Sequence, residues 1–240
     1  MPITPSSRDH ATRDRSAVKR AAACLAVALA SPLLVFIAAL GIRFGAFDMD
    51  FGLGVLTLKA AWFLAWAGGV AAVLAVVVAL RAPRAAAPVA AAALLAAGAT
   101  LGLFLLNFAR ADPSAGFDVS TNPADPPGYS DQLSARRAAA GADALAAGEG
   151  GCAVAAVPNQ VAPGVAAYGL QEAGFDVRGY GVGRADGSRS GFWFGLTHDA
   201  VVRIRPGRTD VRVTARQGRY DDGEACRLAR EIVAALQITP

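Results

Sequence analysis

The chain has 240 residues, of which 54% are hydrophobic, and its mean hydropathy is +0.39, which is too apolar for an ordinary soluble protein. The net charge of +4 divides unevenly, because residues 1–109 hold 9 basic and 4 acidic side chains whereas residues 110–240 hold 14 and 15. The basic excess therefore belongs to the apolar half, which argues against nucleic acid as a partner, since binding nucleic acid requires that excess on the binding domain itself.

A basic tail, residues 1–20, precedes the first of three apolar runs. Its composition is typical of a short juxtamembrane segment that fixes the topology of a membrane protein. The first run, residues 21–42, has about the length needed to cross a bilayer. We interpret it as a transmembrane helix rather than a signal peptide, because it is longer than the usual apolar core of about 7–15 residues and no small-residue cleavage site follows it.

Two further apolar runs, residues 60–80 and 85–108, complete a predicted membrane domain of residues 21–109. Both have the length and composition of transmembrane helices. Gly98 and Gly102, in the third run, have the spacing that lets two helices approach closely, although this motif says little in so alanine-rich a helix.

The connecting loops predict the orientation of these helices. Basic residues gather in the tail and in the turn that holds Arg81 and Arg84, whereas the loop from Arg43 to Lys59 carries acidic and aromatic residues between its ends. The positive-inside rule places the tail and the Arg81–Arg84 turn in the cytoplasm. Three crossings then place residues 110–240 outside, which predicts a multi-pass protein of the bacterial inner membrane with a periplasmic C-terminal domain and the lipid bilayer as its first partner.

The soluble half reads as a linker followed by a folded domain. Residues 110–151 are rich in proline, alanine, glycine and aspartate, and three prolines within Ser120–Ser130 favour extended or turn geometry. Residues 152–240 alternate between strand and helix signals, which predicts a small α+β domain whose antiparallel sheet is covered by helices. The fold class is therefore an α-helical transmembrane anchor of three spans plus this α+β domain.

The elements of the domain are predicted from hydrophobic periodicity and from the glycine, proline and capping residues at their ends. The segment Gly183–Ser188 is expected to be a turn, and Asp221 is expected to cap the last helix, with Glu224 completing a capping box. The expected helices are Asp131–Ala147, Pro163–Ala173 and the last one after Asp221. The expected strands are Phe175–Val182, Arg189–Thr197, Ala200–Arg205 and Thr209–Gln217, with a further short strand over Cys152–Val157.

Two cysteines, Cys152 and Cys226, lie in the half that is predicted to be exported, where disulfides persist. A disulfide between them requires their Cα atoms to approach within about 7 Å. The sequence leaves two alternatives open, a disulfide or two half-buried thiols.

Arginines gather on one face of the hairpin predicted around Pro206-Gly207. Side chains alternate along a strand, so these arginines face away from the apolar residues of the same strands. Guanidinium groups bind phosphate and carboxylate groups through paired hydrogen bonds, which makes this face a candidate site for an anionic small molecule or a lipid headgroup. The alternative is a structural face whose arginines pair across strands with an acidic residue. The candidate site consists of Asp199, Arg203, Arg205, Asp210, Arg212 and Arg216.

Two blocks of the chain resemble the domain of unknown function 1499 family. Ser120–Pro127, STNPADPP, is similar to that family's S/T-T-D-x-x-D-P-P segment, with Asn122 in place of the first aspartate. Phe194–Leu228 is similar to its F-G-F-x-D-D-V-V-V-R-V-R-P run and to the V-D-V-R-S-x-S-R-V-G-x-S-D-x-G-x-N run that follows. The resemblance covers about residues 112–238 and implies a membrane-associated or exported module, without implying an activity. The matching positions are Asp199, Arg203, Arg205, Asp210, Arg212, Arg216, Gly218, Asp221 and Gly223, and the departures are His198, Val213, Ala215 and Ala225.

The sequence contains no nucleophile elbow, phosphate-binding loop or paired-cysteine metal motif, so no cofactor or metal is expected. His198 beside Asp199 could act as a base with an orienting carboxylate. Neighbours on a strand point to opposite faces, which favours a role for His198 in a turn instead. Trp193 and Tyr180 are expected to share a face of the sheet.

The sequence supports three hypotheses for function. The first is a non-catalytic module that contacts other envelope proteins or components. The second is a module that binds an anionic metabolite or lipid on the arginine face. The third, an envelope hydrolase that uses His198 and Asp199, is the least favoured.

Overall fold

The structure is a computed structural model that describes residues 7–142, 152–217 and 220–238. The chain divides into two compact units, residues 1–109 and 110–240, at the boundary where its composition changes. Residues 143–147 of the predicted helix, the rest of the linker to residue 151 and Gly218 of the family pattern lie outside the described residues.

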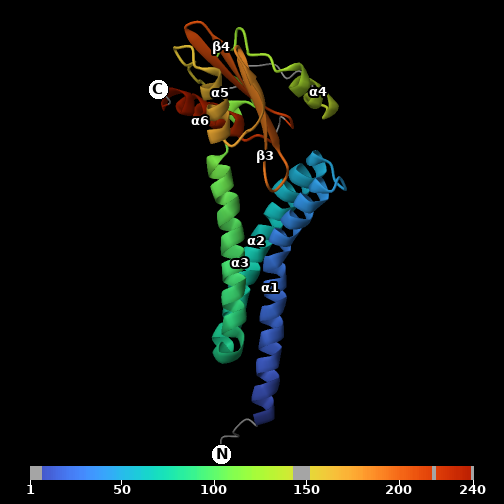
Figure 1. The fold of residues 1–240 in the computed structure, drawn as a ribbon. Coiled ribbons are helices and arrows are strands. Elements are labelled where there is room, and N and C mark those ends of the chain that lie inside the picture. Colours follow the sequence, from blue (N-terminus) through green and yellow to red (C-terminus); the bar gives the residue numbers. More distant parts are fainter. Residues whose placement is uncertain (1–6, 143–151, 218–219, 239–240) are drawn as a thin grey trace, which may run out of the picture. The chain divides into compact units, whose positions relative to one another are not determined.

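The first unit is helical, as its apolar runs predict. Its elements are α1 (Ser7–Arg43), the π-helical segment η1 (Asp50–Ala61), α2 (Trp62–Arg81) and α3 (Pro83–Arg110). Figure 1 shows the start of α1 and the turn between α2 and α3 at the same end of this unit. Three stretches are long and apolar enough to cross a membrane: Thr12–Arg43, Asp50–Arg81 and Pro83–Arg110. The chain is therefore a membrane protein with three candidate spans.

The second span begins earlier than residue 60, because η1 continues directly into α2. Most of the predicted loop is therefore helical. The carboxylate of Asp48 accepts a hydrogen bond from the backbone N–H of Phe51 at 2.7 Å, so an acidic residue interpreted as part of a loop caps the start of a helix.

Small residues set the packing of α1 against α2. A Cβ atom added to Gly68 would lie 3.0 Å from the Cα atom of Ala28, and the Ser31 hydroxyl donates to the carbonyl of Ala61 at 2.7 Å. Close approach and interhelical hydrogen bonds of this kind stabilise helix pairs in lipid. A Cβ atom added to Gly98 or Gly102 would meet nothing within 4 Å, so that pair is not a close contact within the described chain.

The second unit is built on a five-stranded antiparallel sheet with the order β1-β5-β4-β3-β2. The β4–β5 hairpin turns at Gly207, whose φ of 70° lies in the left-handed region that suits glycine. The strands are β1 (Asp118–Ser120), β2 (Asp176–Gly181), β3 (Arg184–Ser190), β4 (Thr197–Arg205) and β5 (Arg208–Ala215).

The prediction for the third strand of the sheet was wrong. Most of the segment expected to be a turn, Gly183–Ser188, belongs to β3, and Gly191–Leu196, expected to be part of a strand, is a turn closed by a hydrogen bond from Gly191 N to Leu196 O at 2.8 Å. The large apolar side chains of that segment alternate in sequence, which is the pattern expected of a strand. β3 itself carries polar residues whose partners come from elsewhere in the chain, so hydrophobic alternation did not reveal it.

Helices cover both faces of the sheet. Figure 1 shows α5 (Pro163–Glu172) and α6 (Glu224–Ile238) on one face and α4 (Asp131–Ala139) beyond the other. Apolar side chains of the strands and helices fill the core between α5, α6 and the sheet, which confirms the α+β class. The fully buried side chains of this core include Leu170, Val202, Val211, Val213, Leu228, Ile232 and Leu236.

The predicted cap of the last helix is confirmed at Asp221, but the predicted capping box is not, because the carboxylate of Glu224 pairs with Arg227 instead. Its side chain accepts from the backbone N–H of Ala225 at 3.0 Å, and its carbonyl accepts from Glu224 N at 2.9 Å. Asp221 lies three residues before Glu224, the first residue of α6, and satisfies two of the free N–H groups at the start of that helix.

The predicted linker is instead part of the domain in its described portion, residues 110–142. It contributes β1 at the edge of the sheet, the 3₁₀ turn η2 (Pro113–Ala115) and α4. The strand expected over Cys152–Val157 is reduced to one bridge between Val157 and Thr209.

Of the two alternatives for the cysteines, the structure has the disulfide. Cys152 is bonded to Cys226, their Cα atoms are 5.9 Å apart, and the bond closes a sequence separation of 74 residues. It ties the chain that precedes α5 to the first turn of α6.

Candidate functional site

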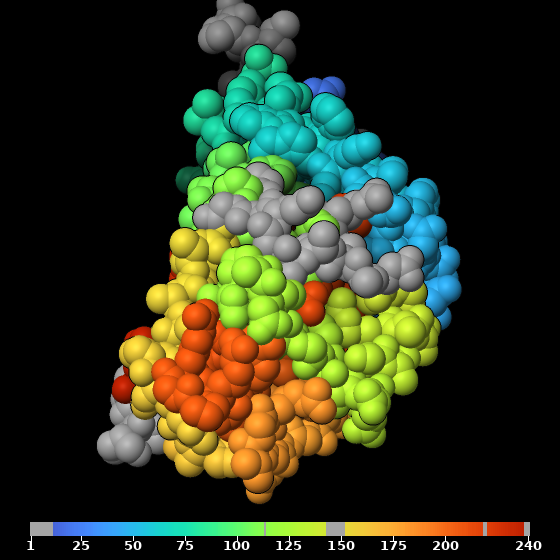
Figure 2. Space-filling model, turned by 90° about the horizontal axis from the view of Figure 1, so that it is seen from above, coloured from blue at the N-terminus to red at the C-terminus, as the bar shows by residue number. Residues whose placement is uncertain are grey.

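The six residues of the candidate site share one face of the sheet, as strand alternation predicts. The register pairs Arg203 with Asp210 and Asp199 with Thr214 across β4 and β5. Residues 121–139 pack over part of this face, and the side chains of Arg203 and Arg205 remain 22% and 39% exposed. Figure 2 shows this segment in lime green beside the orange-red end of the β4–β5 hairpin.

Asp210 is the centre of the first charged cluster, and its side chain is 0% exposed. Its carboxylate accepts from Arg203 at 2.9 Å, from Arg205 at 2.6 Å and from Arg208 at 2.6 Å. Burial alone would raise the pKa of Asp210, but these hydrogen bonds outweigh it and lower the pKa below its usual value. Asp125, from the proline-rich segment, lies 3.0 Å from both Arg203 and Arg205.

Asp118 on β1 forms a second cluster with Arg212. The guanidinium donates two parallel hydrogen bonds, at 2.9 and 2.6 Å, and the hydroxyl of Thr214 donates a third at 2.9 Å. The hydrogen bonds to Asp118 raise the pKa of Arg212 despite burial. Tyr129 completes the cluster, because its hydroxyl donates to Thr214 at 2.5 Å, and burial raises its pKa.

Asp199 on β4 holds the third cluster, and its side chain is also 0% exposed. It accepts two hydrogen bonds from Arg216 at 2.7 Å, one from Arg137 of α4 at 2.9 Å and one from Ser188 of β3 at 2.7 Å. The aromatic ring of Tyr129 contacts an arginine from each of two clusters, because its centroid lies 4.9 Å from the guanidinium carbon of Arg137 and 5.2 Å from that of Arg212. The clusters are thus joined through one aromatic ring.

His198 does not pair with Asp199. It lies on β4 rather than in a turn, and its Nε2 atom is 2.5 Å from the carboxylate of Asp221 at the start of α6. His198 and Asp199 point to opposite faces of the sheet. Both His198 and Asp221 are buried, so this pair ties the sheet to the cap of α6.

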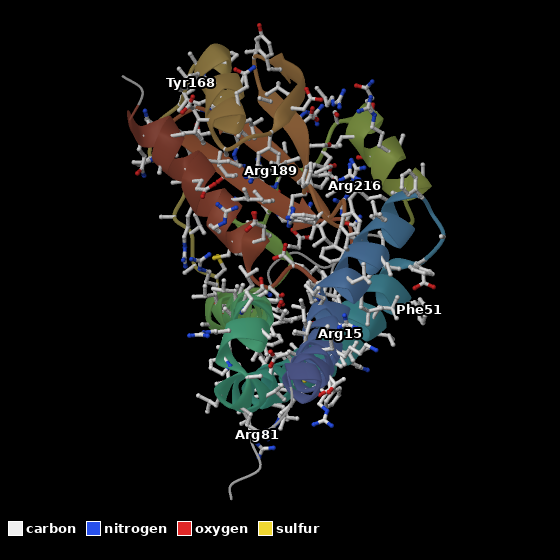
Figure 3. All side chains as sticks on the ribbon, turned by 90° about the horizontal axis from the view of Figure 1, so that it is seen from below. Arg15, Phe51, Arg81, Tyr168, Arg189 and Arg216 are labelled. Atoms are coloured by element: carbon white, nitrogen blue, oxygen red, sulfur yellow. A yellow bond between two sulfur atoms is a disulfide. The ribbon has the colours of Figure 1, made fainter. Side chains whose placement is uncertain are left out.

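Figure 3 shows the two labelled arginines of the sheet on different sides of it, Arg216 toward α4 and Arg189 among α5 and α6. Arg189 donates to the carbonyl of Ala173, which follows α5, at 2.8 Å. The aromatic pair expected to share a sheet face is separated as well, because Tyr180 lies on β2 and Trp193 in the β3–β4 turn. Both are exposed.

A cleft of about 650 Å³ adjoins the arginine face. It lies between the β2–β3 hairpin and the start of α4. Its lining carries three arginines and one carboxylate, so the charge around it is positive. These charged residues are Arg178, Arg184, Asp186 and Arg203, with Ser130 and Tyr180 among the other lining residues.

The arginine face is therefore a closed network of ion pairs. Each buried carboxylate is surrounded by donors, which leaves none of the three free to act as a base or nucleophile, and no group of three metal-ligating side chains occurs among the described residues. The sequence did not reveal half of the network. Four of these residues come from the presumed linker and Ser188 comes from the misassigned strand, whereas Arg208 begins β5 one residue before the predicted strand. The missed partners are Asp118, Asp125, Tyr129, Arg137, Ser188 and Arg208.

The chain was compared with protein-family models, with characterised proteins and with solved structures, and no match was found. The resemblance to the domain of unknown function 1499 family stays a prediction from the two sequence blocks.

Proposed function

We propose that the protein is a multi-pass protein of the bacterial inner membrane and that its α+β domain faces the periplasm as a non-catalytic interaction module for other envelope components. The observation that carries the non-catalytic part is the saturation of the buried carboxylates. Asp199, Asp210 and Asp118 each accept hydrogen bonds from one or more arginines. A catalytic carboxylate needs a free oxygen within reach of substrate, whereas these oxygens hold strands and α4 together.

Two further observations support the location. The Cys152–Cys226 disulfide suits an oxidising compartment outside the cytoplasm. The described part of the basic tail, which begins α1, and the turn between α2 and α3 with Arg81 and Arg84 lie at the same end of the helical unit, where the positive-inside rule expects the cytoplasm. The resemblance to the domain of unknown function 1499 family agrees with an exported module.

A topology measurement tests this proposal. Alkaline phosphatase, which is active only in the periplasm, and green fluorescent protein, which fluoresces only in the cytoplasm, are fused separately to the C-terminus of the full chain. We expect phosphatase activity without fluorescence. Fluorescence without phosphatase activity would overturn the periplasmic location and the envelope role with it.

A second candidate function is the binding of a small anionic molecule or a lipid headgroup, and the cleft is the observation that favours it. The hypothesis made from sequence placed this ligand on the arginine face, whose guanidinium groups are engaged. Arg178 and Arg184 line the cleft and are more accessible than Arg212 and Arg216. Arg178 pairs with the exposed carboxylate of Asp176, and Arg184 donates to the carbonyl of Tyr129 at 3.2 Å. Two guanidinium groups near an aromatic side chain suit a phosphate or carboxylate attached to an apolar group.

Calorimetric titration of the full chain in neutral nanodiscs tests this candidate with inorganic phosphate and with glycerol phosphate as probes. We expect the Arg178→Ala/Arg184→Ala variant to lose binding and Arg230→Ala, on α6 outside the cleft, to retain it. Binding of glycerol phosphate alone would point to a lipid headgroup and binding of both to free phosphate. Equal binding in both variants, or none in the unmodified chain, would remove the candidate.

A further inference from the structure

The β3–β4 turn presents two large aromatic side chains to solvent. Phe192 is 78% and Trp193 60% exposed, and their rings meet edge to face with centroids 5.3 Å apart. Exposing this much aromatic surface to water is unfavourable. Tryptophan and other aromatic side chains are stabilised at the interface between lipid and water, where the ring is half buried and the indole N–H stays hydrated.

The turn lies at the same end of the sheet as the point where the chain enters the domain. Strand register pairs Ser190 with Thr197 at the base of the turn, and Thr197 accepts a hydrogen bond from the backbone N–H of Arg216, just beyond the end of β5. At that end of β5, Ala215 N donates to the carbonyl of Phe117, which immediately precedes β1. The opposite end of the sheet carries the β2–β3 turn, which includes Val182.

Chain connectivity limits how far that end of the domain can lie from the end of the third span. The third candidate span ends at Arg110, and Asp112 is already fixed within the domain, because its N–H donates to the carbonyl of Asp222 at 2.9 Å. Two residues reach at most about 7 Å. Neighbouring strands are about 4.8 Å apart, so the β3–β4 turn is only about two strand spacings across the sheet from β5.

We propose that the β3–β4 turn, through Trp193 and Phe192, inserts into the interfacial layer of the bilayer from which α3 emerges, and so docks the domain on the membrane. The interfacial layer is about 5–8 Å thick on each side of the hydrocarbon core, which is comparable to the reach of the chain from Arg110. This docking rests on the membrane spans and does not depend on which compartment the domain faces.

Fluorescence of a single tryptophan tests the insertion. The full chain contains three tryptophans, Trp62, Trp66 and Trp193, so the variant Trp62→Phe/Trp66→Phe reports on the turn alone. In proteoliposomes of phosphatidylcholine and phosphatidylglycerol, we expect lipids brominated near the headgroup to remove at least about half of its emission. Iodide in the aqueous phase should have little effect.

The matched control moves the indole to the other end of the sheet. Pro206 is exposed in the β4–β5 turn, and the nine residues of β4 separate that turn from the β3–β4 turn by roughly 30 Å. The variant Trp62→Phe/Trp66→Phe/Trp193→Phe/Pro206→Trp should be quenched by iodide and not by brominated lipid. The proposal is overturned if Trp193 behaves like this control. It is also overturned if Trp193 is shielded from both quenchers, since protein would then cover the turn.

Discussion

At the scale of single residues, Asp199 holds three elements together. One buried carboxylate accepts hydrogen bonds from Arg137 of α4, Ser188 of β3 and Arg216 beyond the end of β5. A buried ion pair is not necessarily more stable than an apolar replacement, but removing one partner leaves the other charges buried and uncompensated. The network is therefore sensitive to single substitutions.

We expect Asp199→Ala to lower the free energy of unfolding of the domain by about 3–5 kcal/mol, measured by urea unfolding of the detergent-solubilised chain. Asp125→Ala is the matched control, because that carboxylate pairs with arginines on the same face but is 60% exposed. Its loss should be much smaller. Equal losses for the two variants would contradict the structural role assigned to Asp199.

Asp210 predicts how the domain responds to acid. Its folded-state pKa is lowered by Arg203, Arg208 and Arg205. Its stabilising contribution is therefore complete above the unfolded-state pKa of about 3.9 and is lost as pH falls from there through the folded-state pKa.

We expect Asp210→Asn to be less stable than the unmodified chain at pH 7 and to lose less stability between neutral and acidic pH. Thermal unfolding of the solubilised chain as a function of pH measures both effects. Parallel curves for the two chains would show that Asp210 contributes nothing to the acid response.

At the scale of elements, the segment 121–139 determines the character of the arginine face. Tyr129 reaches Thr214, Ser130 N donates to Asp186 at 3.0 Å, and Arg137 reaches Asp199. The face has the composition of an anion-binding site, but its side chains bond to this segment and stabilise the domain.

In the helical unit, the close contact at Gly68 predicts that a larger side chain there lowers stability. A side chain there would meet the backbone of α1 at Ala28, whereas one at Gly98 would meet nothing within 4 Å. We expect Gly68→Leu to destabilise the helical unit by about 1–3 kcal/mol through overpacking.

Gly98→Leu is the matched control and should change stability by less than about 0.5 kcal/mol. Thermal stability of both variants in detergent, followed by size-exclusion chromatography, checks the difference. An equal loss at Gly98 would show that its face is packed as closely as that of Gly68.

At the scale of the whole molecule, the disulfide and the spans are consistent with one another. The third candidate span ends at Arg110 and is followed by a domain in which Cys152 and Cys226 are bonded. Removing the bond by Cys152→Ser/Cys226→Ser should lower the stability of the domain by about 2–4 kcal/mol, because the unfolded chain gains entropy.

Cys24→Ser is the control for the disulfide, since Cys24 lies in α1 and is a free cysteine. We expect it to leave stability and non-reducing electrophoretic mobility unchanged, whereas the double variant migrates like the reduced chain. Identical mobility of the unmodified chain with and without reductant would contradict the disulfide.

The sequence by itself determined the membrane helices, the α+β class and the common face of the candidate residues. These features follow from local rules: long apolar runs require a bilayer, and alternation along a strand forces Arg203 and Arg212 to one side. The cap at Asp221 and the turn at Gly207 are equally local.

Only the tertiary structure decided what the arginine face is. Several of its contacts join residues that are far apart in sequence. Arg137 is 62 residues from Asp199, Asp125 is 80 from Arg205, and Asp118 is 94 from Arg212. No periodicity in the sequence connects residues so far apart. β3 was missed for the same reason, because its polar side chains are stabilised by partners on other elements. Because the arginines pair with buried carboxylates, they hold strands and α4 together.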